Sequence, residues 1–297
     1  MHLFIFFLLV FFTYIYVWLN KRKNYWKDRG FLHEKFEFPF GSFKGIGSEK
    51  SMCIGLDEYY KKYKGKGMAV GLFCFVKPLL LPIDPELIKM ICVQNFDAFQ
   101  DRLIYYNKED DPISVHLLAL EGQKWKERRQ KLTFVFSSAK MRLMFDIIQL
   151  IGNHFVQSLE NAIKKSNQLE MHDWLARFTT DVISNVAFGM DSSSLNNPQA
   201  DMRKYGKEIL NLGPTGFLKF LFTSSFPALS RKLHITANKK NVIDFFYNTF
   251  KKNIEQRERT ETFRKDFIQI LLELKKSSSL TVSELAAESF IFFLGVC

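Results

Sequence analysis

The chain has 297 residues, and its 42 Lys and Arg residues against 31 Asp and Glu give a formal charge of +11. Hydrophobic residues make up 47% and charged residues 25%, which excludes a wholly disordered or fibrous protein. The 32 Phe residues indicate a large apolar interior or an apolar surface that faces lipid. Four Cys are too few for a disulfide scaffold and have no metal-ligand spacing, so we expect Cys53, Cys74 and Cys92 to be small buried side chains.

The N-terminus reads as a membrane segment. Residues 3–19 are apolar and uncharged, with aromatic rings toward the end, and Lys21, Arg22 and Lys23 follow at once. The positive-inside rule would keep that end and the rest of the chain in the cytosol. The alternative is a cleavable signal, but no Lys or Arg precedes the run and no small-x-small cleavage site follows it. We predict a single-pass anchor over residues 1–20 and a basic, glycine-containing connector over 21–50.

Helical periodicity dominates the remainder. Two short apolar segments, 68–75 and 78–83, are typical of strands, and Asp84-Pro85-Glu86 should cap a helix that runs to about Gln94. A capping box, Thr281-Val282-Ser283-Glu284, precedes a final apolar helix. Further helices are expected at 139–165, 174–188, 199–212, 236–259 and 263–276. The predicted fold class is therefore mainly α with a small β-sheet.

No self-sufficient catalytic or metal motif is present, and the six His residues are scattered. The segment 121–132 is more informative, because Trp125 and Arg129 stand four apart and share one face of a helix. An indole N–H beside a guanidinium suits an anionic group, since both donate and neither accepts. Lys124, Arg128 and Lys131 form an adjacent stripe. The alternative interpretation is an amphipathic basic helix with one buried Trp.

The surrounding motifs extend this pattern. They are Asp111-Pro112-Ile113-Ser114, Lys131-Leu132-Thr133 with Phe136 and Ser138, and Phe178-Thr179-Thr180-Asp181 with Ala187-Phe188-Gly189. As a set, and in this order, they resemble the N-terminal half of a microsomal cytochrome P-450, especially the insect group similar to the vertebrate drug-metabolising enzymes. The resemblance implies a cytochrome P-450 fold over residues 51–297, from helix A to the start of the central helix I.

The resemblance also implies roles for individual residues. Trp125 and Arg129 match a pair that binds one haem propionate, and Arg102 matches a basic residue that reaches the other, although Leu103 follows where the family often has Gly. The Lys124, Arg128 and Lys131 stripe would face the reductase, or else be a solvated face. His116, Leu117, Phe292 and Phe293 would line the substrate pocket.

The implied function is that of a haem-thiolate monooxygenase of the endoplasmic reticulum. Such an enzyme binds haem iron and takes electrons from NADPH through a cytochrome P-450 reductase. It uses O₂ to oxidise small apolar substrates such as xenobiotics or endogenous lipophiles. Nucleic acid is not an expected partner, because the basic residues are dispersed.

One part of the family pattern is missing. The loop Phe-x-x-Gly-x-x-x-Cys-x-Gly that supplies the haem thiolate is absent, and Gly295-Val296-Cys297 stands where the central helix should read Ala-Gly-x-Asp/Glu-Thr. Cys297 is not expected to be the axial ligand, because the family's thiolate lies on the opposite side of the haem. We therefore expect the chain as given to be inactive. The alternative function is a non-catalytic, membrane-tethered pseudoenzyme or partner-binding protein.

A Phe- and Leu-rich connector lies between the helices predicted at 199–212 and 236–259. It begins at Gly213-Pro214-Thr215-Gly216, which should break the preceding helix, and continues with apolar residues from Phe217 to Leu229. It resembles the family's F–G region, which lies over the substrate entrance and dips into the bilayer surface. Burial against the rest of the domain is the alternative.

Overall fold

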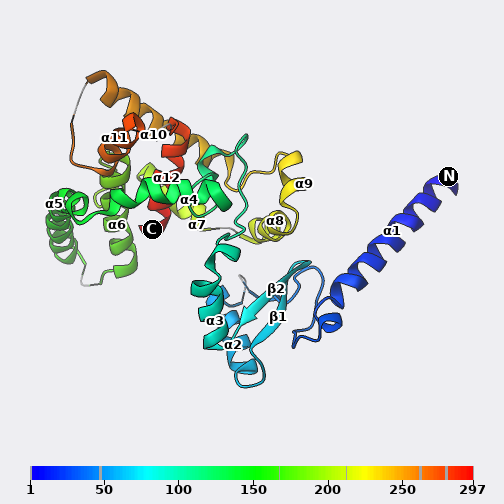
Figure 1. Ribbon diagram of the computed structural model, residues 1–297. Helices are drawn as coiled ribbons and strands as arrows, with labels where there is room; N and C mark the ends of the chain where they lie inside the picture. Colours follow the sequence, from blue (N-terminus) through cyan, green and yellow to red (C-terminus); the bar gives the residue numbers. More distant parts are fainter. Residues whose placement is uncertain are drawn as a thin grey trace. The chain divides into compact units, whose positions relative to one another are not determined.

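The computed structural model describes residues 2–46, 49–166, 168–211, 213–260, 263–277 and 280–296 (Figure 1). It is mainly helical with one two-stranded sheet, as predicted. Contacts group the chain into two units, Met1–Gln100 with Gly213–Ser230, and Asp101–Leu212 with Arg231–Cys297. The domain boundaries expected at residues 20 and 50 stay predictions.

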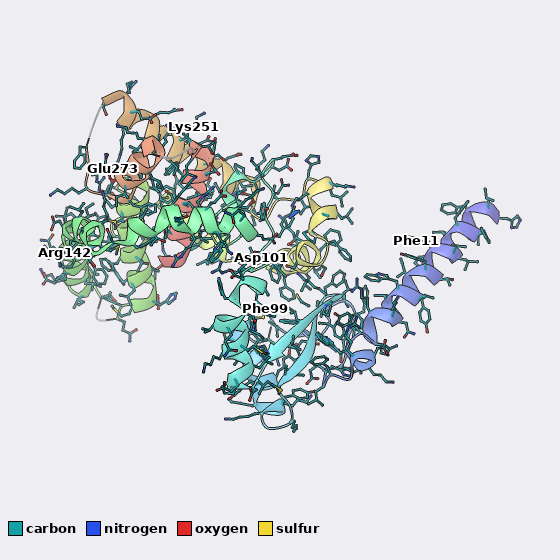
Figure 2. The ribbon with its side chains drawn as sticks, in the orientation of Figure 1. Phe11, Phe99, Asp101, Arg142, Lys251 and Glu273 are labelled. Atoms are coloured by element: carbon teal, nitrogen blue, oxygen red, sulfur yellow. The ribbon has the colours of Figure 1, made fainter. Side chains whose placement is uncertain are left out.

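The first unit begins with the apolar helix α1 (His2–Lys23). None of its residues is buried, and Phe11 projects freely from it (Figure 2). By length and composition the helix could cross a membrane. Its last turn consists of Lys21, Arg22 and Lys23, so the helix runs slightly past the predicted end of the anchor.

A hairpin forms the sheet of this unit. Strand β1 (Ala69–Cys74) pairs antiparallel with β2 (Lys77–Pro82), in the register that joins Ala69 to Pro82 and Cys74 to Lys77. Every residue of β1 is buried. Gly71 leaves room for the Trp26 ring, whose Nε1 donates to the Leu72 carbonyl oxygen at 2.9 Å. Both predicted strands are confirmed.

Capping explains the short helices beside the hairpin. The Asp84 carboxylate accepts a hydrogen bond from the Leu87 amide at 2.9 Å, which begins α3 (Pro85–Lys89) as predicted. The chain continues as a π-helical turn, η2 (Met90–Gln94), and α2 (Met52–Tyr63) lies earlier in the chain. Cys74 is buried, but Cys53 and Cys92 are exposed, so that expectation is wrong for both. They lie on the helices α2 and η2, in which Gly55 of α2 is the only described residue that is buried, so most of their side chains face solvent.

The Phe-rich connector is itself helical. The chain forms α8 (Gly213–Ser225) directly after the expected break, so the connector contains a helix that the sequence pattern did not indicate. Leu221 is buried and Phe217 packs beside it, in a cluster with Phe43 and Cys74 of the same unit. Other apolar residues stay on the surface, including Leu218 at 48% and Phe220 at 43% exposure. One helix therefore combines buried apolar residues with exposed ones, so both expected environments occur within α8.

The second unit is a bundle of helices. Its members are α4 (Gly122–Thr133), α5 (Ser138–Ile163), α6 (Met171–Phe188), α7 (Asp201–Leu210), α10 (Lys240–Thr260), α11 (Phe267–Ser277) and α12 (Val282–Val296); α9 (Pro227–Lys232) bridges the boundary between units in the sequence. The helices predicted in this part of the chain are confirmed, with ends shifted by a few residues.

Helix α12 organises the core of this bundle. The predicted capping box forms, with the Glu284 amide donating to the Thr281 hydroxyl and the Thr281 amide donating to Glu284. From there α12 packs against α6, α10 and the 3-10 turn η4 (Pro112–Ser114). Its Phe290 and Phe293 rings meet Phe246 of α10 in a fully buried aromatic cluster. The core therefore fixes α12 against the loop that leads into α4.

Candidate functional site

The Asp101 carboxylate contacts the first residue of α4, the helix that carries two of the expected haem-binding residues. Oδ1 of Asp101 accepts a hydrogen bond at 2.6 Å from the amide of Gly122, the first residue of α4. An anion at this end of a helix is also favoured by the helix dipole. The contact joins the segment that carries Arg102 to the start of the helix that carries Trp125. Sequence reasoning did not assign this positioning role to Asp101.

The structure brings two of the expected propionate donors together. The guanidinium carbon of Arg102 lies 5.7 Å from the centre of the Trp125 ring. Arg129 follows Trp125 by one helical turn and is exposed. Neither arginine forms a salt bridge with a carboxylate among the described residues. The Arg102 guanidinium near the indole, and an exposed Arg129 one turn further along α4, are a donor set that fits a pair of carboxylates, such as haem propionates.

The backbone conformation of Leu103, which stands where the family often has Gly, is one that favours glycine. Leu103 adopts a φ of +55°, in the left-handed region that favours glycine. The turn after Arg102 therefore keeps its left-handed conformation despite the Leu side chain. The assignment of Arg102 to a haem propionate stays a prediction.

The expected role of Arg128 is wrong. Its side chain is only 6% exposed and points to α12, so it cannot face a docking partner. Nη1 donates to Oε1 of Glu288 at 2.7 Å, and Nη2 contacts Glu284. A buried guanidinium is costly unless it is paired, and the fork of Arg128 reaches both the buried Glu288 and the partly exposed Glu284. Arg128 therefore joins α4 to the central helix.

Glu288 extends this contact to the loop before α4. Its Oε2 accepts a hydrogen bond from the Leu117 amide at 3.2 Å. Burial raises the pKa of Glu288 to about 7, although Arg128 acts in the opposite direction. The pKa of Glu284 is lowered. Burial alone would raise it, but the hydrogen bond from the Thr281 amide and the charge of Arg128 have the larger combined effect. The sequence signal that could have revealed Glu288 is a carboxylate within the largely apolar run 285–296.

The four residues expected to line a substrate pocket have different surroundings. Phe293 is fully buried among Phe188 and Phe246, so no surface remains to line a pocket and this prediction is wrong. The Phe292 ring contacts Phe136 and Phe267. For Phe292 and for the two loop residues below, a pocket role stays a prediction.

His116 and Leu117 lie in the loop before α4. Leu117 packs partly against the core of the bundle. His116 is buried, and its Nδ1 has no hydrogen-bond partner among the described residues. Burial lowers the pKa of His116 to about 4, so its ring is neutral at physiological pH.

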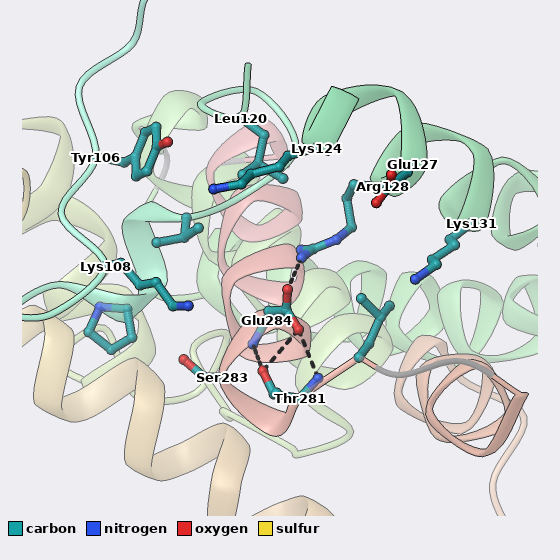
Figure 3. Close-up of a pocket in the computed structure, with 13 residues that line it drawn as sticks. Tyr106, Lys108, Leu120, Lys124, Glu127, Arg128, Lys131, Thr281, Ser283 and Glu284 are labelled. Carbon is teal, nitrogen blue, oxygen red and sulfur yellow. Dashed lines mark hydrogen bonds and ion pairs between the residues drawn. The ribbon is translucent and has the colours of Figure 1, made fainter. Parts of the chain in front are cut away.

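A cavity lies beside the contact between Arg128 and Glu284 (Figure 3). It has a volume of about 380 Å³ and lies between α4, the loop before it and the start of α12. Lys124 and Lys131, the remaining members of the predicted stripe, line it. Their expected contact with a reductase stays a prediction.

No group of three His, Cys, Asp or Glu side chains is placed to hold a metal ion in the part of the chain that the structure describes. Cys297 lies outside the described residues.

Comparison with known proteins identifies the family pattern. Residues 37–296 match the family model of cytochrome P-450. Cytochrome P-450 6A1 of Musca domestica is 37% identical over 279 residues, which cover 92% of this chain and 55% of that protein. Cytochrome P-450 6a9 of Drosophila melanogaster is 35% identical over 290 residues, covering 94% of this chain and 58% of that protein. The chain thus spans somewhat more than half the length of these relatives.

Proposed function

Because the chain belongs to the cytochrome P-450 family, we propose that it provides the N-terminal, propionate-binding part of a haem-thiolate monooxygenase. The observation that carries this proposal is the arrangement of Arg102, Trp125 and Arg129. The Arg102 guanidinium lies near the Trp125 ring, and Arg129 stands one turn away without a described carboxylate partner. These are the three residues to which the family resemblance assigns the propionate contacts.

The residues of this chain would act by binding and orientation. Arg102 and Arg129 would neutralise the two carboxylates of the cofactor, and Trp125 would donate to one of them. The contact of Asp101 with Gly122 holds Arg102 near Trp125. Bound haem supplies the activation of O₂ toward a small apolar substrate. The aromatic core around α12 would help to exclude water from that reaction.

A ligand without propionate charges tests the proposal. Haem and haem dimethyl ester are titrated separately into the purified chain in detergent, with Trp quenching as the signal. We expect the ester to bind at least tenfold more weakly, because it removes the two charges that the arginines would contact. The Asp101→Ala variant, which removes the acceptor for the Gly122 amide, should reduce this difference, whereas Asp146→Ala on α5 should leave it unchanged. Equal affinity of wild type for both ligands would refute the proposal.

We also propose that the 297-residue chain has no monooxygenase activity by itself. It contains no Phe-x-x-Gly-x-x-x-Cys-x-Gly sequence, and the relatives extend well beyond the matched region. The thiolate ligand gives the iron its electron push toward O–O cleavage. The test measures NADPH-dependent hydroxylation with added cytochrome P-450 reductase. Turnover above that of heat-treated protein would contradict the proposal.

The proposed location is the endoplasmic reticulum membrane, with the body in the cytosol. The support is the unburied apolar helix α1 and its basic last turn. The proposed partners are the reductase and a small lipophilic substrate. In a protease-protection experiment on microsomes, residues after Lys23 should be digested without detergent. Protection of the body would reverse the proposed orientation.

A further inference from the structure

The cavity beside α4 is separate from the proposed haem contacts. Trp125 and Arg129 occupy one face of α4, whereas Lys124, Arg128 and Lys131 occupy the next. Only the second set lines the cavity, together with the loop before α4 and the first residues of α12. Figure 3 shows Lys108, Lys124 and Lys131 directed toward this space from two different segments. Its volume of about 380 Å³ lies within the range of small-molecule sites.

The cavity has an excess of positive charge. Its lining includes Lys108, Lys124, Arg128 and Lys131, against the carboxylates of Glu127 and Glu284. None of the three lysines forms a salt bridge with a described carboxylate. Glu284 is already held by Arg128 and Thr281, and Glu127 accepts a hydrogen bond from Gln123 at 3.1 Å. The lysine ammonium groups are therefore available to a negatively charged ligand.

The remaining lining restricts the kind of anion. Hydroxyl groups of Tyr106 and Ser283 add possible donors at the cavity wall. The amino-terminal end of α12 also meets the cavity and adds a favourable dipole for an anion. Apolar surface comes from Pro112, Val115, Leu120 and Leu280. A free inorganic ion would leave this surface unused, whereas a ligand with a charged head and an apolar body would cover it.

We propose that this cavity binds a small organic anion, with a carboxylate or phosphate ester as its head and an aromatic or short aliphatic group as its body. Lys108, Lys124 and Lys131 supply the positive charge that the head requires. The apolar body lies against Pro112, Val115 and Leu120. The site requires no haem and does not rest on the proposed function.

Such a ligand would also stabilise the junction of two helices. The cavity is bounded by α4 and α12, which Arg128 and Glu284 already join. A ligand that binds only the folded chain raises its apparent stability by mass action. Binding should therefore be visible both as heat and as an increase in the unfolding temperature.

The experiment uses the full chain in detergent, free of haem, and three probes of similar size. Benzoate and phenyl phosphate represent the two heads, and benzyl alcohol is the uncharged control. Isothermal titration should show saturable binding of at least one anion and roughly tenfold weaker binding of the alcohol. Raising NaCl from low to moderate concentration should weaken anion binding. Whichever anion binds more tightly identifies the head.

Matched variants locate the site. Lys108→Met and Lys131→Met keep most of the side-chain volume and remove the charge, and each should weaken anion binding by roughly fivefold. Lys165→Met, at an exposed position beyond α5, should bind as wild type does. Circular dichroism and the unfolding temperature without ligand verify that each variant folds. The proposal is overturned if neither anion binds, if benzyl alcohol binds equally well, or if the two cavity variants match Lys165→Met.

Discussion

The two neighbouring arginines of α4 have opposite surroundings. Arg129 is exposed, without a described acidic partner, one turn after Trp125. Arg128 is buried and holds Glu284 and Glu288 of α12. The difference arises because one step along a helix turns a side chain by about 100°. Two adjacent arginines in the sequence therefore combine a residue available to a ligand with one that holds the bundle together.

Loss of Arg128 should have the largest effect. Arg128→Met removes the charge that compensates Glu288, a fully buried carboxylate, and should lower the free energy of unfolding by about 3–5 kcal/mol. Urea unfolding followed by circular dichroism measures it. The variant Arg142→Met, on α5, should change the free energy by less than about 0.5 kcal/mol. Similar values for both variants would show that the contact with α12 contributes little.

The protonation of Glu288 should make stability depend on pH. Its pKa is about 7 in the folded chain, above the ordinary value of 4.5, because the folded environment favours the protonated form. This contribution to stability is complete below pH 4.5 and is lost as the pH rises through 7. Arg128 and Glu284 are the charged groups that influence it.

The Glu288→Gln variant should remove this dependence while keeping an acceptor for the Leu117 amide. Between pH 5 and pH 8 the free energy of unfolding of wild type should decrease. The decrease should be smaller in the variant, by about 1–3 kcal/mol. Glu160→Gln on α5 is the control and should follow the wild-type profile. Parallel profiles for all three proteins would exclude Glu288 as the titrating group.

Helix α8 shows a similar contrast in the first unit, where Leu221 is buried and Leu218 and Phe220 are exposed. If the exposed side meets lipid, Leu218→Ser with Phe220→Ser should reduce liposome flotation of protein lacking residues 1–23 by about tenfold. Phe145→Ser with Leu150→Ser removes two apolar residues from α5 that are more exposed, at 60% and 58%. Equal losses from the two pairs would mean that general surface hydrophobicity, rather than α8, determines flotation.

The smallest effect concerns the backbone beside Arg102. Leu103→Gly should raise the free energy of unfolding by about 0.5–1 kcal/mol, because its φ of +55° is unfavourable for Leu. Leu118, another exposed loop residue, does not have a positive φ. Leu118→Gly should therefore leave stability unchanged or lower it. A loss of stability in Leu103→Gly, measured by thermal unfolding, would contradict this account of the turn.

Features with local causes were predictable from the sequence. The Asp84 cap and the Thr281–Glu284 capping box depend on residues three positions apart, and both formed as predicted. The burial of Arg128 depends on Glu288, which is 160 positions away, so no local pattern reports it. Helix α8 was missed because Gly213 and Pro214 end one helix but also begin the next, where Pro is readily accommodated.

The central claim is that Arg129 is available to the cofactor whereas Arg128 supports the fold. Its most direct test is the Arg129→Met variant, measured both by urea unfolding and by haem titration. We predict a free energy of unfolding within about 0.5 kcal/mol of wild type and haem binding weakened by about tenfold, the loss of one charge-assisted contact. Wild-type haem affinity, or a loss of stability as large as that of Arg128→Met, would contradict the claim.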